Sequence, residues 1–157
     1  MKRLISLLLF VTTVMIASAF DLAEECDNIK GVSTVSINQS MLKLVSFPDK
    51  GTNPVDLEAL SSRLDKVQII NADEPAPSAA VKNAVNRYLS GAPRFERTMK
   101  MKDGDESVMM YMRTLSVSRS NEPQNEFLII VEDAPDITVV LLVGKITMDE
   151  LANVTDL

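Results

Sequence analysis

Acidic side chains are densest in the run 102–107, which reads Lys-Asp-Gly-Asp-Glu-Ser. Carboxylates spaced two residues apart around a glycine resemble the start of a calcium-binding loop. A calcium loop, however, supplies six or more oxygens and includes a distant bidentate carboxylate at a fixed position. This run stops after three acidic side chains. We therefore predict a tight hairpin turn with Asp103 and Gly104 as its central residues.

Five of the nine methionines fall close together: Met99, Met101, Met109, Met110 and Met112. Grouped thioethers can bind soft metal ions such as copper(I), and methionines also form adaptable binding surfaces. Methionine equally fills gaps in a core. A turn at Asp103 and Gly104 sets Met99 opposite Val108. One predicted core face then holds Phe95, Met99, Met101, Val108, Met110 and Met112. Met109 and Tyr111 fall on the opposite face, as a possible exposed contact patch.

Four carboxylates could be interpreted as containing an acid–base pair: Glu126, Glu132, Asp133 and Asp136. Carboxylates that flank turns are usually only solvated, so we expect no catalysis from them. The chain contains no histidine, which excludes a Ser-His-Asp triad, a Cys-His pair and a histidine-ligated zinc site. Its five glycines are scattered singly, so no glycine-rich phosphate loop is present. We expect a protein without enzymatic activity, cofactor or metal.

Cys26 is the only cysteine, so no disulfide can form within this chain. It could be the lipidated cysteine of a bacterial lipoprotein, but Ala23–Glu25 before it do not match a lipobox. It could also form an intermolecular disulfide, since the compartment is oxidising. No cationic residue beside it lowers its pKa, so we favour an unreactive thiol near a loosely held N-terminus.

The first half of the chain alternates between strand and helix patterns. We predict a strand over 32–37, a short helix capped by Asn38–Ser40, a helix from Pro54 through Leu64, a strand over 67–70 and a helix over 78–89. The segment 73–78 contains two prolines and is predicted to be a loop. Gly91 is placed to end the preceding helix in the left-handed conformation.

From Arg94 onward the apolar period becomes two. We predict strands over 94–102, 106–117, 127–131 and 137–143, a polar loop over 118–125 and a turn over 133–136. Thr147 and Glu150 have the spacing of a capping box and start a last helix. Four strands joined by short turns indicate an antiparallel meander. The predicted fold is therefore an α+β two-layer sandwich, in which helices cover one face of a mainly antiparallel sheet.

The first residues predict where the protein is sent. Lys2 and Arg3 precede an almost wholly apolar run, residues 4–16, and the small residues Ala17–Ala19 follow. This pattern is typical of a cleavable secretory signal, and the run is too short to span a bilayer. We predict that residues 1–19 are a signal peptide, recognised through Ala17 and Ala19, with Phe20 as the first mature residue. We predict that residues 20–157 form a single domain.

Charge narrows the choice of partners. Removing Lys2 and Arg3 takes away two positive charges and lowers the formal net charge from −6 to −8. An acidic domain repels nucleic-acid phosphates and anionic lipid headgroups. The absence of tryptophan argues against a sugar-stacking platform. We expect an exported protein, periplasmic or secreted, without a lipid anchor or membrane span, and a protein partner in the cell envelope.

Three segments resemble a known family. They are the strand Val32–Ile37 with Ser40–Lys43, the step Leu64–Ile69, and the strand Leu141–Ile146 that runs into Met148–Leu151. Together they are similar to the domain-of-unknown-function 4252 family of exported bacterial proteins. The resemblance implies small envelope proteins, secreted or lipid-anchored, with no established activity or catalytic motif. It also implies products encoded near alternative sigma factors, which suggests envelope signalling, and it supplies no site residues.

The leading interpretation is an exported, non-enzymatic envelope protein that binds a partner or takes part in extracytoplasmic signalling. One alternative is a hydrolase or metal-dependent enzyme that uses the carboxylates. Another is a structural component of the cell surface.

Overall fold

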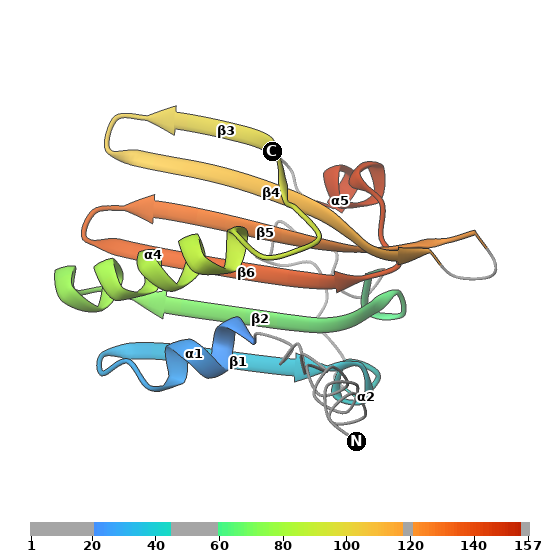
Figure 1. The fold of residues 1–157 in the computed structure, drawn as a ribbon, viewed down its shortest axis with the longest axis horizontal. Helices are drawn as coiled ribbons and strands as arrows, with labels where there is room; N and C mark the ends of the chain where they lie inside the picture. Colours follow the sequence, from blue (N-terminus) through green and yellow to red (C-terminus); the bar gives the residue numbers. More distant parts are fainter. Residues whose placement is uncertain (1–20, 45–59, 118–120, 155–157) are drawn as a thin grey trace, which may run out of the picture.

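Six strands form one antiparallel sheet in the computed structural model, which describes residues 21–44, 60–117 and 121–154. The strands lie in the order β1-β2-β6-β5-β4-β3 (Figure 1). Their bounds are β1 Val32–Asn38, β2 Leu64–Ala72, β3 Glu96–Asp103, β4 Glu106–Val117, β5 Pro123–Asp133 and β6 Asp136–Gly144. The helices are α1 Leu22–Asp27, α2 Gln39–Leu42, α4 Pro75–Leu89 and α5 Met148–Val154. The predicted signal peptide, with Ala17, Ala19 and Phe20, lies outside the described residues, as does the start of the helix predicted from Pro54.

The last four strands, β3 to β6, follow one another in the chain and lie side by side in the sheet. This arrangement confirms the predicted α+β class with an antiparallel four-strand meander. β2 adds to the outer side of β6, and β1 then pairs with β2, so β1 and β3 are the two edge strands. Within the described ranges, none of the helices is long and apolar enough to cross a membrane.

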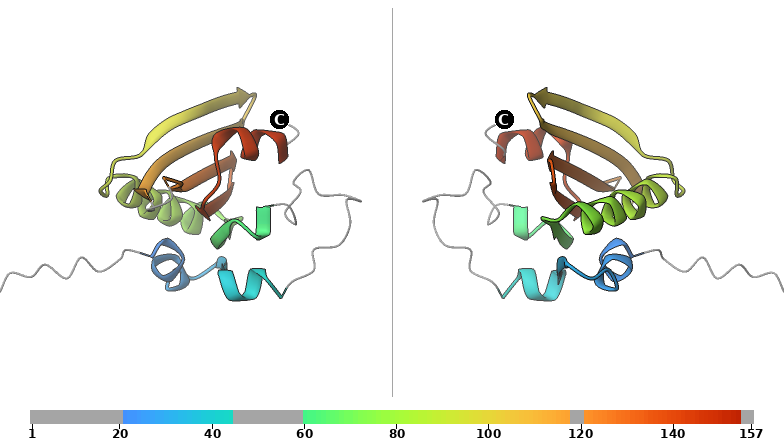
Figure 2. Two further views of the ribbon diagram at one scale, coloured as in Figure 1. Left: turned by 90° about the vertical axis from the view of Figure 1, so that its right-hand side faces the viewer. Right: turned by 90° about the vertical axis from the view of Figure 1, so that its left-hand side faces the viewer.

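The two faces of the sheet are covered to different extents (Figure 2). Helices α1 and α4 pack on one face, here called the covered face. Helices α2 and α5 pack at one end of the other, here called the open face. Strand residues buried on the covered face are Ile70, Ala72, Leu128, Ile130, Ile137, Val139, Leu141 and Val143. The predicted helix layer on one face is therefore α1 with α4, and the structure adds α2 and α5 on the other.

Helix α4 begins earlier than predicted because its two prolines lie in its first turn. Pro75 is the first helical residue, where a missing N–H costs no helical bond, so the segment 73–78 is not a loop throughout. The apolar side that packs on the covered face is the predicted one and consists of Val81, Ala84, Val85 and Tyr88. The helix ends at Leu89 with Ser90 as a right-handed cap, so the left-handed end predicted at Gly91 is wrong.

Strands β2 and β5 are longer than predicted. Leu64, which was expected to lie in a helix, opens β2. Pro123, which was expected in a loop, opens β5. The first residue of a strand is one of the few strand positions that tolerate proline, because no ladder hydrogen bond is lost there.

Three short helices, α1, α2 and α5, start at side-chain caps; for α2 it is the predicted Asn38, whose Oδ1 accepts from the Met41 N–H at 3.1 Å. Asp21 Oδ1 accepts hydrogen bonds from the N–H groups of Ala23 and Glu24, at 3.1 and 3.2 Å, and so starts α1, which the sequence analysis missed. Thr147 and Glu150 form the predicted capping box before α5. The Glu150 N–H donates to Thr147 Oγ1 at 3.2 Å, and the Thr147 N–H donates to Glu150 Oε2 at 2.8 Å.

The β3–β4 hairpin has the predicted strands but turns one residue later. Its central residues are Gly104 and Asp105, and Gly104 has a φ of +58° at the position where a type II′ turn requires glycine. Val108 therefore opposes Met101 rather than Met99. Because the register changes by two residues, these side chains stay on their predicted face.

A β-bulge between Arg97 and Met99 changes the alternation at the start of β3. Phe95 consequently lies on the covered face, with its ring centroid 5.7 Å from that of Tyr88, and not with the methionines as predicted. The open face keeps the rest of the predicted set: Met99, Met101, Val108, Met110 and Met112.

Candidate functional site

A buried polar cluster joins α4, β4 and β5 beneath the covered face. Arg113 Nε and the Tyr88 hydroxyl both donate to the carboxylate of Glu126, which is 1% exposed. The Arg113 guanidinium also lies over the ring of Phe95, with 4.2 Å from Cζ to the ring centroid. Burial, and then the bond to Glu126, raises the pKa of Tyr88. The two charges are paired away from solvent, so this cluster holds the fold and does not receive a ligand.

The four carboxylates that could have contained an acid–base pair are separated by the fold. Glu126 belongs to the buried cluster. Glu132 pairs with Lys82, with 3.0 Å between Oε2 and Nζ, beside α4. Asp133 and Asp136 lie directly opposite each other at the β5–β6 turn. The four side chains therefore do not face a common cavity.

Cys26 lies in the core between α1 and the covered face and is 0% exposed. Burial, and then the charges of Glu25 and Asp27, raises the pKa of its thiol to about 11. A protonated and covered thiol does not react readily, in agreement with the interpretation as an unreactive residue. The segment around it is not loosely held, because Leu22 packs into the same core.

Met109 and Tyr111 lie on the face opposite Met110, as predicted. That face is the covered one, and both side chains are half-buried against its core. They therefore do not form the exposed patch that was expected. Their neighbours on the open face, Val108 and Met112, are half-buried as well, and Met112 packs against the core that α2 and α5 share with that face.

The open face carries a continuous apolar floor beyond α2 and α5. Its side chains are half-buried or exposed, and each is uncharged: Val35, Ile69, Met99, Met101, Val108, Met112, Ile129, Val131 and Val140. Val35 is 45% exposed on edge strand β1, and Met101 is 50% exposed on edge strand β3. These side chains extend across the whole width of the sheet, and together we call them the apolar floor.

One end of the apolar floor is bordered by carboxylates. Asp103 opposes Glu106, Glu106 opposes Asp133, and Asp133 opposes Asp136. We call these four residues the acidic row; they lie at the hairpin ends on the left of Figure 1. All four are exposed, and no salt bridge in the described part of the chain neutralises them. Like charges directly opposite one another destabilise a sheet, so the row costs the free protein stability.

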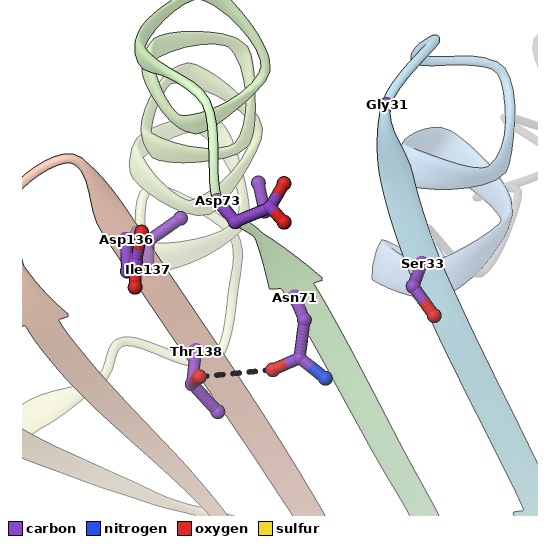
Figure 3. A pocket seen from close by; sticks show the side chains of 8 residues that line it. Gly31, Ser33, Asn71, Asp73, Asp136, Ile137 and Thr138 are labelled. Atoms are coloured by element: carbon purple, nitrogen blue, oxygen red, sulfur yellow. Dashed lines mark hydrogen bonds between the residues drawn. The ribbon is translucent and has the colours of Figure 1, made fainter.

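A shallow hollow of about 300 Å³ adjoins the acidic row (Figure 3). It is lined by Gly31, Ser33, Asn71, Ala72, Asp73, Asp136, Ile137 and Thr138. The Thr138 hydroxyl donates to Asn71 Oδ1 at 2.9 Å, so this amide is held in place. Ala72 pairs with Ile137, which sets Asp73 beside Asp136 and extends the line of carboxylates past the end of β2.

This arrangement favours attraction of positive groups over metal chemistry. Among the residues that the structure describes, no three His, Cys, Asp or Glu side chains are grouped to hold a metal ion. The acidic row is spread over four strands, and neighbouring strands lie about 4.8 Å apart, so its four carboxylates span too great a distance to bind one ion together. Aligned carboxylates beside an apolar surface instead attract and orient a cationic partner.

The acidic row could have been predicted from the sequence, but only by comparing separate segments and not from any single one. Asp103, Glu106, Asp133 and Asp136 each flank one of two predicted turns. In a meander, alternate turns lie at the same end of the sheet, so these four carboxylates had to become neighbours. What the sequence did not indicate was which sheet face would remain open.

The comparisons with known proteins identify the family of the chain. The family model described as Domain of unknown function (DUF4252) matches residues 26–154, a range that reaches from α1 to the end of α5. The chain belongs to this family, which confirms the resemblance found in the sequence. No curated protein and no solved structure matches the chain.

Proposed function

We propose that this protein is an exported envelope protein without enzymatic activity, which binds a protein partner through the open face of its sheet. The observation that carries the proposal is the apolar floor, which runs from Val35 to Met101 across all six strands. Contiguous apolar surface of this kind marks interaction sites in soluble proteins. Covering about 400 Å² of it contributes on the order of 10 kcal/mol, before the cost of association is subtracted.

Two further features support a binding role. The carboxylates that catalysis would need are closed into the buried cluster, paired with Lys82, or exposed along the acidic row. The hollow beside Asp73 and Asp136 is shallow and open, whereas catalysis favours sites that exclude water. A partner surface requires neither a raised carboxylate pKa nor an enclosed pocket.

The position of Cys26 supports export without a lipid anchor on this residue. A lipidated N-terminal cysteine would require cleavage directly before Cys26, which would remove the Asp21 cap and the fully buried Leu22. It would also require a thiol that is 0% exposed to carry an acyl-glycerol group. Cleavage before Phe20 keeps α1 and its cap intact.

N-terminal sequencing of the mature protein, recovered from the extracytoplasmic fraction, tests the export part of the proposal. We expect a chain that begins at Phe20. A chain that begins at a modified Cys26, or one that keeps Met1, would contradict it.

Capture from a native envelope extract tests the binding part. The purified domain is compared with Val35→Asn/Met101→Gln, which removes the two most exposed side chains of the apolar floor without adding charge. The matched control is Leu115→Gln/Val117→Asn, which removes two exposed apolar residues near the end of β4 that do not belong to the apolar floor. We expect a cross-linked partner with the wild type and the control, and its loss with the open-face variant. Equal capture by all three proteins would overturn the proposal.

A further inference from the structure

We infer that the segment bound on the open face is a cationic amphipathic helix, with its apolar side on the apolar floor and its lysine or arginine residues at the acidic row. The inference rests on the proposed function and adds the chemistry of the partner. It follows from two adjoining surfaces of opposite character: an uncharged floor and, at one end, a line of carboxylates without counterions among the described residues.

The acidic row is the first argument, because its geometry stores repulsion that a cationic partner would relieve. Asp133 has a carboxylate directly opposite it on both neighbouring strands, Glu106 on β4 and Asp136 on β6. Some acidic residues elsewhere in the fold are paired with cations, such as Glu25 with Arg87 and Glu132 with Lys82. The row differs from these positions in having exposed, aligned and unneutralised charges.

The shape of the open face is the second argument. On the covered face, the 15-residue helix α4 lies roughly along the strands, over β6 and β2, and buries one apolar side (Figure 1). The open face presents the same strands, and its floor is closed at one end by α2 and α5 and bordered at the other by the row. A helix on this floor would have one end at the carboxylates. The hollow beside Asp73 and Asp136 has room there for the head of a lysine or arginine side chain.

Net charge argues against a second copy of the chain as the occupant. The full chain carries a formal charge of −6, and removal of the predicted leader makes it −8. Two such molecules repel each other as they approach, whereas a basic segment is attracted to the row. The methionines Met99, Met101 and Met112 are suited to different helical side chains, because their unbranched thioethers adapt in shape.

Methyl NMR of the full mature domain provides the test, with labelled methionine methyl groups as reporters. Met99, Met101 and Met112 report on the open face, and Met109 on the covered face is the internal control. Two synthetic amphipathic leucine helices are titrated: one with lysines at one end, and one with glutamates at the same positions. We expect the lysine peptide to shift the open-face methyls and leave Met109 unchanged, with affinity that falls as salt rises.

Charge-neutralised variants then locate the interaction. Glu106→Gln/Asp133→Asn removes two charges of the acidic row, and the control Glu24→Gln/Asp149→Asn removes two exposed charges elsewhere. We expect the first variant to bind the lysine peptide about fivefold more weakly and the control to bind like the wild type. Equal weakening by both variants would show attraction by net charge alone and overturn the inference.

Three other outcomes would overturn the inference. The proposed function would still stand in each case if capture from the envelope depends on Val35 and Met101. The first is equal binding of the lysine and glutamate peptides. The second is no shift of the open-face methyls with either peptide. The third is a concentration-dependent shift of those methyls without peptide, which would identify a second copy as the occupant. Loss of face-dependent capture, by contrast, would remove the proposed function itself.

Discussion

The covered and open faces are formed by alternate residues of the same six strands. They differ in whether charged side chains are paired and in how much apolar area is buried. On the covered face, Leu128, Val139 and Ile70 are each 0% exposed, and Glu126 is paired with Arg113. On the open face, the apolar floor is half-buried or exposed, and the carboxylates beside it have no salt bridge to any residue that the structure describes. One set of side chains stabilises the domain, and the other remains available to a partner at some cost in stability.

The two faces also differ in the types of apolar residue that they contain. The strand residues buried on the covered face are mainly leucine, isoleucine and valine, whose rotamers are well defined and pack densely. The open face adds four methionines from β3 and β4, which tolerate changes in their surroundings. We therefore expect equivalent substitutions on the two faces to change the free energy of unfolding by different amounts.

The largest expected effect comes from breaking the buried cluster of the covered face. Arg113→Ala leaves the Glu126 carboxylate buried without its cation, so we expect a loss of about 3–5 kcal/mol in the free energy of unfolding. The control is Arg87→Ala, whose pair with Glu25 is mostly exposed at the arginine and should cost no more than about 1 kcal/mol. Urea unfolding measures both. Similar losses in the two variants would mean that the cluster does not act as a buried ion pair.

Adjacent residues of β5 compare the two faces directly. Leu128→Ala opens a cavity under α4 and is expected to cost about 3 kcal/mol, whereas the half-buried Ile129→Ala on the open face is expected to cost about 1 kcal/mol. Chemical denaturation of both variants, with unchanged m-values, provides the measurement. A larger loss at Ile129 would show that the open face is the more tightly packed one.

The third prediction uses pH. Burial alone would raise the pKa of Asp21, but hydrogen bonds from Lys66 and Gln68 outweigh it and hold the pKa below its usual range. A depressed folded-state pKa contributes stability at neutral pH that is lost as pH falls through that value. Asp21→Asn keeps an α1 cap but cannot titrate, so its stability should fall less between about pH 4 and pH 2.

The expected effect is below about 1 kcal/mol, since Asp21 is only partly buried and solvent screens its pair with Lys66. Thermal unfolding of the wild type and the variant over this pH range measures the difference. Parallel pH curves would show that Asp21 contributes no titrating stability.

The smallest effect is expected at the acidic row and has the opposite sign. Glu106→Gln/Asp133→Asn removes two facing carboxylates and should stabilise the free protein by about 0.5 kcal/mol, while weakening partner binding. Differential denaturation at low salt gives the value, and added salt should reduce the gain. A destabilised double variant would mean that these carboxylates support the fold instead of opposing it.

Local patterns in the sequence were enough to predict most of the sheet. The alternation after Arg94, the turn residues near Gly104 and Asp136, and the box at Thr147 define the meander and α5, because each depends on neighbours in the chain. The turn register was wrong by one residue, since a glycine can take positive φ as the first or the second central residue of a hairpin. A single bulge then sufficed to move Phe95 to the other face.

The candidate site was harder to predict because it depends on which face the helices cover. Both faces of β4 carry methionine, so the pattern alone did not distinguish Met109 from Met110. Long-range packing of α1 and α4 determines which face is covered. The sequence analysis missed α1, although Asp21 and Glu24 have the spacing of a capping box. Local propensity could not predict which face is covered, because tertiary contacts override local preference.

The cap of α1 also has a consequence for the order of events during maturation. Asp21 is the second residue after the proposed cleavage point, and in the folded domain Lys66, Gln68 and the start of α1 all bind its carboxylate. A peptidase acts most readily on chain that is free to extend into its active site. If residues 1–19 are removed as proposed, we expect that cleavage to precede the docking of α1, so that folding follows processing.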